Sequence, residues 1–257
     1  MPLESLLSLQ SWARDPQRIN HETAGQATVI EIYTDATANG LKVSIGLEEL
    51  KLEYKVHRVF LGGEQMTPEF TALNPNNKIP VLVDDDVVVS ESGAILIYLA
   101  EKTGKLLPKE PRARIKTIEM VINQMASLGP MLGQLFVFRG AWQNKVPEVT
   151  DRYFKEVSRI YGVLNRRLEG RPYFAGNEYT IADIAFLPWI RGLARACART
   201  ASGPEGPDDP RAVPAGKTVR GLYQGHRRCR RSPQIINPVR WDGWVPLHRT
   251  VVQGNSK

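Results

Sequence analysis

Cysteine is the scarcest residue type in this chain of 257 residues. The two cysteines, Cys197 and Cys229, lie towards the C-terminal end, and residues 1–192 contain none. So few cysteines predict neither a disulfide framework nor a metal site with cysteine ligands. Any thiol chemistry in residues 1–192 must therefore use the thiol of a bound ligand, and we expect no metal ion.

Long hydrophobic runs are absent as well. No apolar run reaches the roughly 18–20 residues that a membrane span needs. The N-terminal segment has no basic residues before its apolar residues and no small-residue cleavage site, which argues against a signal peptide. We therefore expect a cytoplasmic protein without membrane contact. Hydrophobic content of 42% and charged content of 24% are ordinary for a globular domain.

Acidic residues are scarce only in the C-terminal part. Residues 193–257 hold ten Arg and two Lys against four acidic residues, whereas residues 1–192 hold 22 basic and 23 acidic residues. The net charge of +7 thus originates in a tail that also contains seven Pro and seven Gly. A basic face on a folded domain would indicate a nucleic-acid partner. A Pro/Gly/Arg-rich tail does not indicate such a partner, so we expect no nucleic-acid binding.

Residues 28–108 show the pattern of a small α/β domain. Residues 28–33 predict a strand, an amphipathic helix follows, and residues 54–59 alternate as a second strand. A right-handed crossover makes these two strands parallel. The remaining elements are a helix after Thr67, strands over residues 79–83 and 87–89, and a helix that begins near Ser90 and ends at Gly104. The order β-α-β-α-β-β-α predicts a thioredoxin-like fold.

Residues 109–192 predict an all-α bundle. One long helix spans about residues 112–139, with an interruption expected at Gly129-Pro130, and another runs over about residues 147–168. A third begins at Thr180, with Asp183 as the acid of a capping box. Residues 1–27 are expected to form an N-terminal arm.

The helical pattern breaks after Gly192. Residues 193–257 are therefore expected to form an atypical, poorly structured tail. The abrupt change fits an out-of-frame or intron-derived segment, and equally a divergent splice product. If the tail is genuine, part of the helical bundle lacks its cover, and we expect reduced stability.

The order of motifs resembles that of the soluble glutathione transferases over residues 28–192. The resemblance is carried by Tyr33 to Gly40, Pro68-Glu69-Phe70, Asn74 to Pro80, Glu91 to Leu99 and Tyr179 to Ala185. The loop Thr37-Ala38-Asn39-Gly40 and the segment from Leu128 to Gln134 are similar to the nu-class branch. That branch includes bacterial disulfide-bond reductases and fungal proteins similar to the yeast nitrogen-regulation prion protein. The resemblance implies a glutathione-binding domain over residues 28–108, a helical domain over residues 109–192, and a homodimer.

The resemblance also implies glutathione as co-substrate. Pro80 matches the family's cis-proline, which would present the backbone of Ile79 to the cysteine of the tripeptide. A trans proline at a strand start is the structural alternative. Glu91 and Ser92 open a helix, where free N–H groups and the helix dipole favour a bound carboxylate. The alternative is simple capping, in which Ser90 or Ser92 caps the helix and Glu91 complements its dipole.

Four further contacts are implied by matching positions. Gln65 matches a position that contacts the tripeptide, or else is a solvated loop amide. Asn77 and Lys78 match the side that binds the glycine carboxylate. Arg152 matches an arginine of the helical domain that reaches a glutathione carboxylate in nu-class relatives, or else is a solvated helix charge.

The chemistry is expected in the loop after the first strand. A free thiol has a pKa near 8.5 and reacts as the thiolate, so lowering that pKa by two units requires about 2.7 kcal/mol of thiolate stabilisation. The resemblance implies that Thr37 Oγ1 and the side chain or N–H of Asn39 donate the necessary hydrogen bonds. Helix capping by either residue is compatible with that role. Tyr33 is the rival donor, although its place inside a strand favours packing.

Three functions follow from the resemblance. The first is a glutathione S-transferase that conjugates glutathione to an electrophilic small molecule, in detoxification or in secondary metabolism. In the second, the same site reduces disulfides with two glutathiones in turn. The third is a regulatory or binding protein with little catalysis. The presence of Thr37 and Asn39 favours an enzyme.

Overall fold

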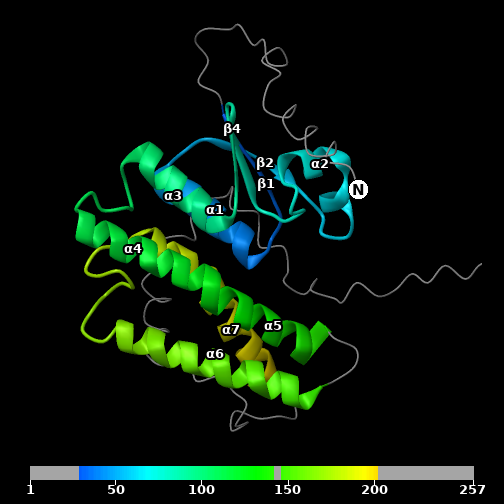
Figure 1. Ribbon diagram of the computed structural model, residues 1–257, viewed down its shortest axis with the longest axis vertical. Helices are drawn as coiled ribbons and strands as arrows, with labels where there is room; N and C mark the ends of the chain where they lie inside the picture. The colour runs from blue at the N-terminus through cyan, green and yellow to red at the C-terminus, as the bar shows by residue number, and fades with distance from the viewer. Residues whose placement is uncertain (1–28, 142–145, 202–257) are drawn as a thin grey trace, which may run out of the picture.

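The computed structural model describes residues 29–141 and 146–201 (Figure 1). The predicted arm over residues 1–27 and residues 202–257 of the predicted tail lie outside the described residues. An α/β domain occupies the upper part of the view in Figure 1, and helices α4 to α7 lie below it.

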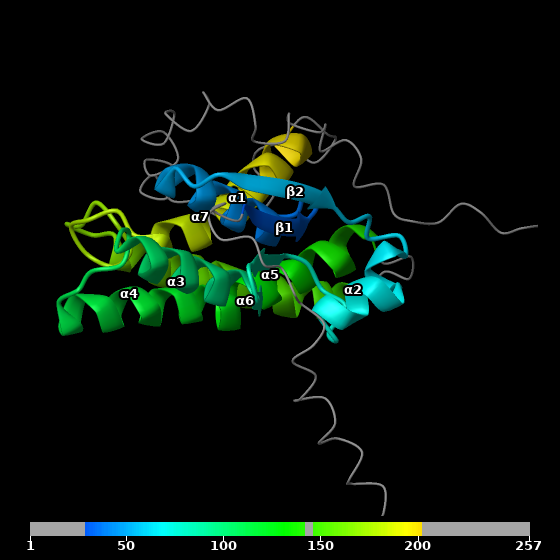
Figure 2. The same cartoon turned by 90° about the horizontal axis from the view of Figure 1, so that it is seen from above.

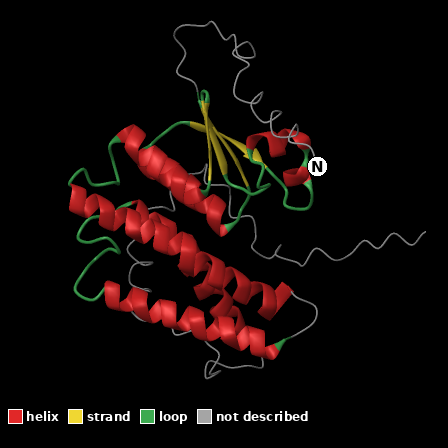
Figure 3. Ribbon diagram, in the orientation of Figure 1, coloured by secondary structure: helices red, strands yellow, loops and turns green. Residues whose placement is uncertain are grey.

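The first domain has the predicted order of elements. They are β1 (Ile30–Thr34), α1 (Ala38–Leu50), β2 (Tyr54–Arg58), the 3₁₀ turn η2 (Glu64–Met66), α2 (Pro68–Leu73), β3 (Val81–Asp84), β4 (Val87–Ser90) and α3 (Ser92–Thr103). The four strands form one sheet in the order β2-β1-β3-β4 (Figure 3). Strands β1 and β2 are parallel, and the other two pairs are antiparallel. This topology confirms the thioredoxin-like fold.

Helices cover both faces of this sheet. Because side chains alternate along a strand, the apolar residues divide between the two faces. Ile32 of β1 packs with Leu47 of α1 and Leu99 of α3 on one face. On the other face, Phe70 of α2 packs with Val81 of β3. The sheet is therefore a fixed platform for the loops at its ends.

The second domain consists of α4 (Pro111–Asn123), α5 (Gly129–Phe136), α6 (Pro147–Arg167) and α7 (Ile181–Ala201), with π-helical segments η3 (Gln124–Leu128) and η4 (Val137–Ala141). The predicted interruption of the first long helix is confirmed, and it takes the form of η3. Pro130 lacks the N–H that would continue the α-helical hydrogen bonds. The N–H of Gly129 reaches the carbonyl of Gln124, five residues back, which is the π-helical pattern.

One hydrophobic core fills the helical domain and continues into α3. Val157, Tyr161 and Leu164 form the buried stripe of α6. Leu96 and Ala100 of α3 belong to the same cluster. Figure 2 shows α3 running alongside α4. This shared core holds the α/β domain against the helices.

The helical stretch Pro111–Arg139 meets the length and hydropathy criteria of a membrane span, and only those. Its Met120, Val121 and Leu132 are buried in the helical core. Helices of globular domains pass the same two criteria, so this match alone is weak evidence for a membrane span.

Helix α7 corrects the predicted boundary of the tail. The sequence pattern predicts a loss of regular structure after Gly192, but α7 continues to Ala201. Residues 193–201 are rich in Ala and Arg, which have high helix propensity. The prediction was wrong there because it extended the Pro/Gly character of the later residues back to residue 193.

Candidate functional site

Three segments that the sequence singles out meet at one end of the sheet. Tyr33 near the end of β1 pairs with Val81 at the start of β3, and Val81 pairs with Ser90 at the end of β4. The loop after β1, the segment before β3 and the start of α3 therefore lie at the same end. The predicted residues at this end are Thr37, Asn39, Ile79, Pro80, Glu91 and Ser92.

Thr37 caps α1 through its side chain. Its backbone is extended, and its Oγ1 accepts a hydrogen bond from the N–H of Gly40 at 3.0 Å. A hydroxyl that accepts one bond still has its own proton to donate. Thr37 therefore combines helix capping with a donor for an anion, at a helix N-terminus whose dipole also favours negative charge.

Gly40 allows this turn to close. A Cβ atom at this position would lie 2.3 Å from both the carbonyl oxygen of Asp35 and the Oγ1 of Thr34. No side chain fits such an approach, so only glycine permits the observed turn.

Asn39 is held by the helical domain. Its Oδ1 accepts a hydrogen bond from Nε1 of Trp189 on α7 at 3.0 Å, and α1 packs against α7. Sequence reasoning missed Trp189, because the two residues are 150 positions apart and no local pattern indicates the contact.

The Ile79–Pro80 peptide bond is cis, as predicted. Ile79 precedes the first paired residue of β3, so its backbone N–H and C=O lie outside the strand pairing. Asn77 has a φ of 54° and donates through Nδ2 to the Gln65 carbonyl at 2.8 Å and to Thr71 Oγ1 at 2.6 Å. The side-chain amide of Asn77 thus anchors the turn that precedes Pro80.

Gln65 and Lys78 flank that turn. The side-chain amide of Gln65 donates to the Leu61 carbonyl at 3.2 Å and accepts from the N–H of Gly63 at 3.1 Å. The Gln65 side chain is therefore engaged within its own loop, and its contact with a tripeptide stays a prediction. Lys78 is exposed, which leaves its ammonium accessible to a carboxylate.

Glu91 occupies the N-cap position of α3 in an unusual backbone conformation. Its φ of 71° lies in the region that favours glycine, and its side chain makes no capping hydrogen bond. Such a conformation costs of order 1–3 kcal/mol in a non-glycine residue, and these residues cluster at functional sites. The Glu91 residue is exposed, and its contact with the ammonium of the tripeptide stays a prediction.

Ser92 lies at the contact between the two domains. It is 3% exposed, its Oγ accepts from Nζ of Lys42 at 3.4 Å and lies 3.7 Å from Sδ of Met125. Lys42 is buried and also donates to Oε1 of Gln124. Burial lowers the pKa of Lys42 to about 7, although the charge of Glu91 acts in the opposite direction. A carboxylate contact by the Ser92 hydroxyl stays a prediction that requires this hydroxyl to turn.

Arg152 is the one predicted binding residue in the helical domain. It is exposed on α6, which packs mainly against α5 and the two π-helical segments. A hydrogen bond from Arg159 lowers the pKa of Glu156, and the charge of Arg152 adds to that effect. The structure thus places Arg152 near Glu156 on the helix surface, and its contact with a glutathione carboxylate stays a prediction.

Tyr33 packs within the sheet, as its strand position predicts. Its ring stacks on His57 with the centroids 4.5 Å apart, and its hydroxyl donates to Oε2 of Glu31 at 3.3 Å. Burial and then the Glu31 carboxylate raise the pKa of Tyr33. Both effects disfavour a role for this hydroxyl in stabilising a thiolate.

Asp183 forms the predicted capping box. Its Oδ2 accepts from the N–H of Thr180 at 2.9 Å, and Oγ1 of Thr180 accepts from the N–H of Ala182 at 3.3 Å. Its Oδ1 also accepts from the N–H of Phe174 at 3.0 Å. Asp183 is therefore a folding element that joins α7 to the loop before it.

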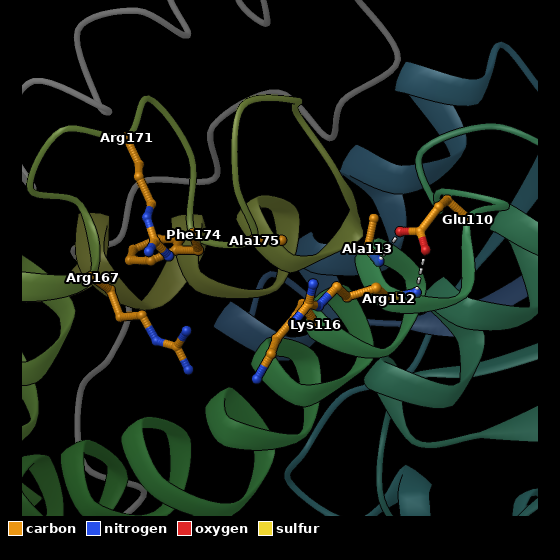
Figure 4. Close-up of a pocket in the computed structure, with 8 residues that line it drawn as sticks. All are labelled: Glu110, Arg112, Ala113, Lys116, Arg167, Arg171, Phe174 and Ala175. Atoms are coloured by element: carbon orange, nitrogen blue, oxygen red, sulfur yellow. Dashed lines mark hydrogen bonds between the residues drawn. The ribbon is translucent and has the colours of Figure 1, made fainter.

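A cavity of about 390 Å³ lies between the start of α4, the end of α6 and the loop that follows α6 (Figure 4). It is lined by Glu110, Arg112, Ala113, Lys116, Arg167, Arg171, Phe174 and Ala175. Lys116 and Arg167 share Glu119 as an ion-pair partner. None of the predicted binding residues lines this cavity. Within residues 29–141 and 146–201, no group of three His, Cys, Asp or Glu side chains could hold a metal ion.

Comparison with known sequences matches both domains. The family models for the N-terminal and C-terminal domains of glutathione S-transferases match residues 38–102 and 128–200. The disulfide-bond oxidoreductase YfcG of Escherichia coli (strain K12) is 45% identical over 175 residues, which cover 65% of this chain and 81% of that protein.

Crystal structures of two glutathione transferases have a similar fold. One, from Pseudomonas putida, has one glutathione disulfide bound per subunit; its TM-score is 0.67 at 36% identity, over 88% of this chain and 94% of that chain. The other, from Burkholderia graminis, has two glutathione molecules bound per subunit. Its TM-score is 0.64 at 39% identity, over 88% of this chain and 96% of that chain.

Proposed function

Because the chain belongs to the glutathione S-transferase family, we propose that its Thr37 and Asn39 activate the thiol of bound glutathione. The observation that carries this proposal is the turn after β1, where a capping hydroxyl and an oriented amide stand at the start of α1. Hydrogen bonds to a charged group contribute about 1.5–3 kcal/mol each. Two such donors supply the thiolate stabilisation of about 2.7 kcal/mol that a drop of two pKa units requires.

The remaining contacts of glutathione follow from the same end of the sheet. The backbone of Ile79 would pair with the cysteine of the tripeptide, and the carboxylate of Glu91 would accept from its ammonium. The free N–H groups at the start of α3, with Ser92, would bind the γ-glutamyl carboxylate. Lys78 would pair with the glycine carboxylate.

A glutathione thiolate supports two reactions. In disulfide reduction, it attacks one sulfur of a disulfide, and the other sulfur leaves as a thiolate that takes a proton from water. A second glutathione thiolate then attacks the mixed disulfide, which releases glutathione disulfide and the second product thiol. In conjugation, the thiolate attacks an electrophilic carbon, and the leaving group departs with the bonding electron pair.

Disulfide reduction is the reaction that we favour, and conjugation is the second candidate. The identity of 45% to a disulfide-bond oxidoreductase supports the first, as does the glutathione disulfide bound to a relative. Because residues 1–192 contain no cysteine, we infer that another glutathione supplies the second thiol. The similarity to glutathione transferases supports conjugation.

The proposal includes the nu-class branch and a homodimer. The Thr37-Ala38-Asn39-Gly40 loop and the similarity to YfcG support the branch. Ile115 and Ile122 on α4 are 58% and 56% exposed, and this apolar pair supports a second copy of the chain as partner. Light scattering at micromolar concentration tests the dimer, and a mass of one chain would reject it.

Two assays with shared variants test the reaction. Turnover of a mixed disulfide and of an aromatic chloride is measured for the wild type, Thr37→Val and Asn39→Ala. Loss of one donor to the thiolate is expected to lower the turnover about tenfold. Thr37→Ser, which keeps the cap and the hydroxyl, is the matched control and should retain most of the activity.

The pattern of the two assays separates the three functions. Faster turnover of the disulfide supports reduction, and turnover of the aromatic chloride alone supports conjugation. Binding of glutathione without turnover in either assay would instead identify a regulatory or binding protein. A wild type that does not bind glutathione would reject the proposal altogether.

A further inference from the structure

We propose that Trp189 of the helical domain is a positioning residue for the glutathione thiol. Its indole N–H holds the side-chain amide of Asn39 in the one orientation that can donate to a thiolate. This inference rests on the proposed function, in which Asn39 contacts the sulfur of glutathione.

The orientation follows from the chemistry of the two side chains. A carboxamide presents an acceptor oxygen at one end and a donor NH₂ at the other, whereas the indole Nε1–H is only a donor. The bond of 3.0 Å from Trp189 therefore fixes Oδ1 of Asn39 towards the indole. The NH₂ then stands at the other end of the amide. Without the indole N–H, the amide could also turn its oxygen towards the thiolate. The partial negative charge of that oxygen would then repel the thiolate sulfur.

The indole is itself held in place by neighbouring backbone. A Cβ atom at Gly129 or Gly133 of α5 would lie 3.7 Å or 3.6 Å from the indole ring carbons, so the ring packs directly over these two glycines. Nζ of Lys42 lies 5.9 Å from the centroid of the indole ring. Because Trp189 contacts α5 as well as α1, a displacement of the indole would disturb the packing between the domains.

Lys42 connects the region around the Trp189–Asn39 hydrogen bond to Ser92 at the start of α3. It follows Asn39 by three positions on α1, which places both side chains on one face of the helix. Its ammonium donates to Oε1 of Gln124 in η3 and to Oγ of Ser92 at the start of α3. Lys42 thus links the start of α1 directly to the start of α3 and also to η3 of the helical domain.

A double-mutant cycle tests the inference. Trp189→Phe keeps an aromatic ring but removes the indole N–H together with part of the ring that packs over Gly129 and Gly133. The pKa of the bound glutathione thiol is measured from the ultraviolet absorbance of the thiolate against pH, for the wild type, Trp189→Phe, Asn39→Ala and the double variant. We expect Trp189→Phe to raise this pKa by about half a unit, which lowers the rate below that pKa about threefold. We expect the Kd for glutathione to change less than twofold.

The cycle distinguishes positioning from packing. If Trp189 acts through Asn39, the substitution adds nothing to the thiol pKa in the Asn39→Ala background. An unchanged thiol pKa in Trp189→Phe would overturn the inference, and so would additive effects in the double variant. A wild type that does not bind glutathione would be a failure of the proposed function. If glutathione binds normally and the thiol pKa changes in Asn39→Ala but not in Trp189→Phe, only this inference fails.

A second variant tests the orientation if Trp189→Phe does not fold. In Asn39→Asp, one carboxylate oxygen accepts from the indole and the other takes the place of the NH₂. The thiol pKa is then expected to rise more than in Asn39→Ala. Asn177→Asp adds the same charge at an exposed position of the helical domain and is the control. A thiol pKa in Asn39→Asp that is no higher than in Asn39→Ala would overturn the inference.

Discussion

The two domains position their functional residues in different ways. In the α/β domain, Thr37 is held by Gly40, and Asn77 is held by Gln65 and Thr71, all within twelve residues along the chain. The helical domain acts across 150 positions, through the hydrogen bond from Trp189 to Asn39. The proposed recognition of glutathione therefore depends on local turns, whereas the orientation of the Asn39 amide depends on packing between the domains.

The largest effect is expected where the local turn is tightest. Gly40→Ala places a Cβ atom 2.3 Å from two oxygen atoms, so the turn after β1 has to open. We expect a loss of about 3 kcal/mol in the free energy of unfolding, measured by urea denaturation. Glutathione turnover should fall together with stability.

Gly62→Ala is the control, because a Cβ atom there meets nothing within 4 Å. Its free energy of unfolding should stay within about 0.5 kcal/mol of the wild type. Equal stability of Gly40→Ala and Gly62→Ala would show that the turn is not fixed as described.

A comparison of two caps contrasts the domains directly. Asp183 is 4% exposed and accepts from the buried N–H groups of Thr180 and Phe174. Asp183→Ala leaves both groups without this acceptor and is expected to cost about 3 kcal/mol in the free energy of unfolding. Thr67→Ala, which removes a single cap of α2, should cost about 1 kcal/mol. Equal losses in the free energy of unfolding of Asp183→Ala and Thr67→Ala, measured by urea denaturation, would contradict the expected difference between the two caps.

Local patterns explain why much of the fold could be predicted from the sequence. The turn before Pro80, the N-cap at Thr67 and the capping box at Asp183 each depend on neighbours within a few residues. Asn39 and Lys42 lie within the first two turns of α1, but their partners Trp189 and Gln124 come from a different domain. No periodicity or cap reports such a contact, because it is set by how the helices pack.

The pH dependence of stability provides a test of the contact between the domains. Burial lowers the pKa of Lys42 from 10.5 to about 7, so between these values the folded chain binds fewer protons than the unfolded chain. The free energy of unfolding therefore rises with pH in that window, by up to about 1.4 kcal/mol per pH unit from this group. Lys42→Met should remove this rise, measured as the difference from the wild type at pH 7, 8 and 9.

The contradicting outcome is a parallel pH dependence of the wild type and Lys42→Met. It would mean that the Lys42 ammonium is solvated in the folded chain. Lys51→Met, a substitution of an exposed lysine at the end of the same helix, is the control and should leave the rise unchanged.

The smallest effect on stability is expected at the strained residue Glu91. Because its φ is 71°, Glu91→Gly relieves backbone strain and should raise the free energy of unfolding by about 0.5–1 kcal/mol. The same change removes the carboxylate and should weaken glutathione binding in calorimetry. Asp85→Gly, at a φ of 57° in the turn between β3 and β4, should leave glutathione binding unchanged. Unchanged binding in Glu91→Gly would remove Glu91 from the site.

The thiol pKa of glutathione bound to the wild type is the most direct measurement of thiolate activation at the start of α1. Calorimetry first establishes saturation, and the ultraviolet absorbance of the thiolate is then followed against pH. Activation by Thr37 and Asn39 predicts a bound thiol pKa of about 6.5, roughly two units below that of the free thiol. A saturated protein whose glutathione still titrates near 8.5 would contradict it.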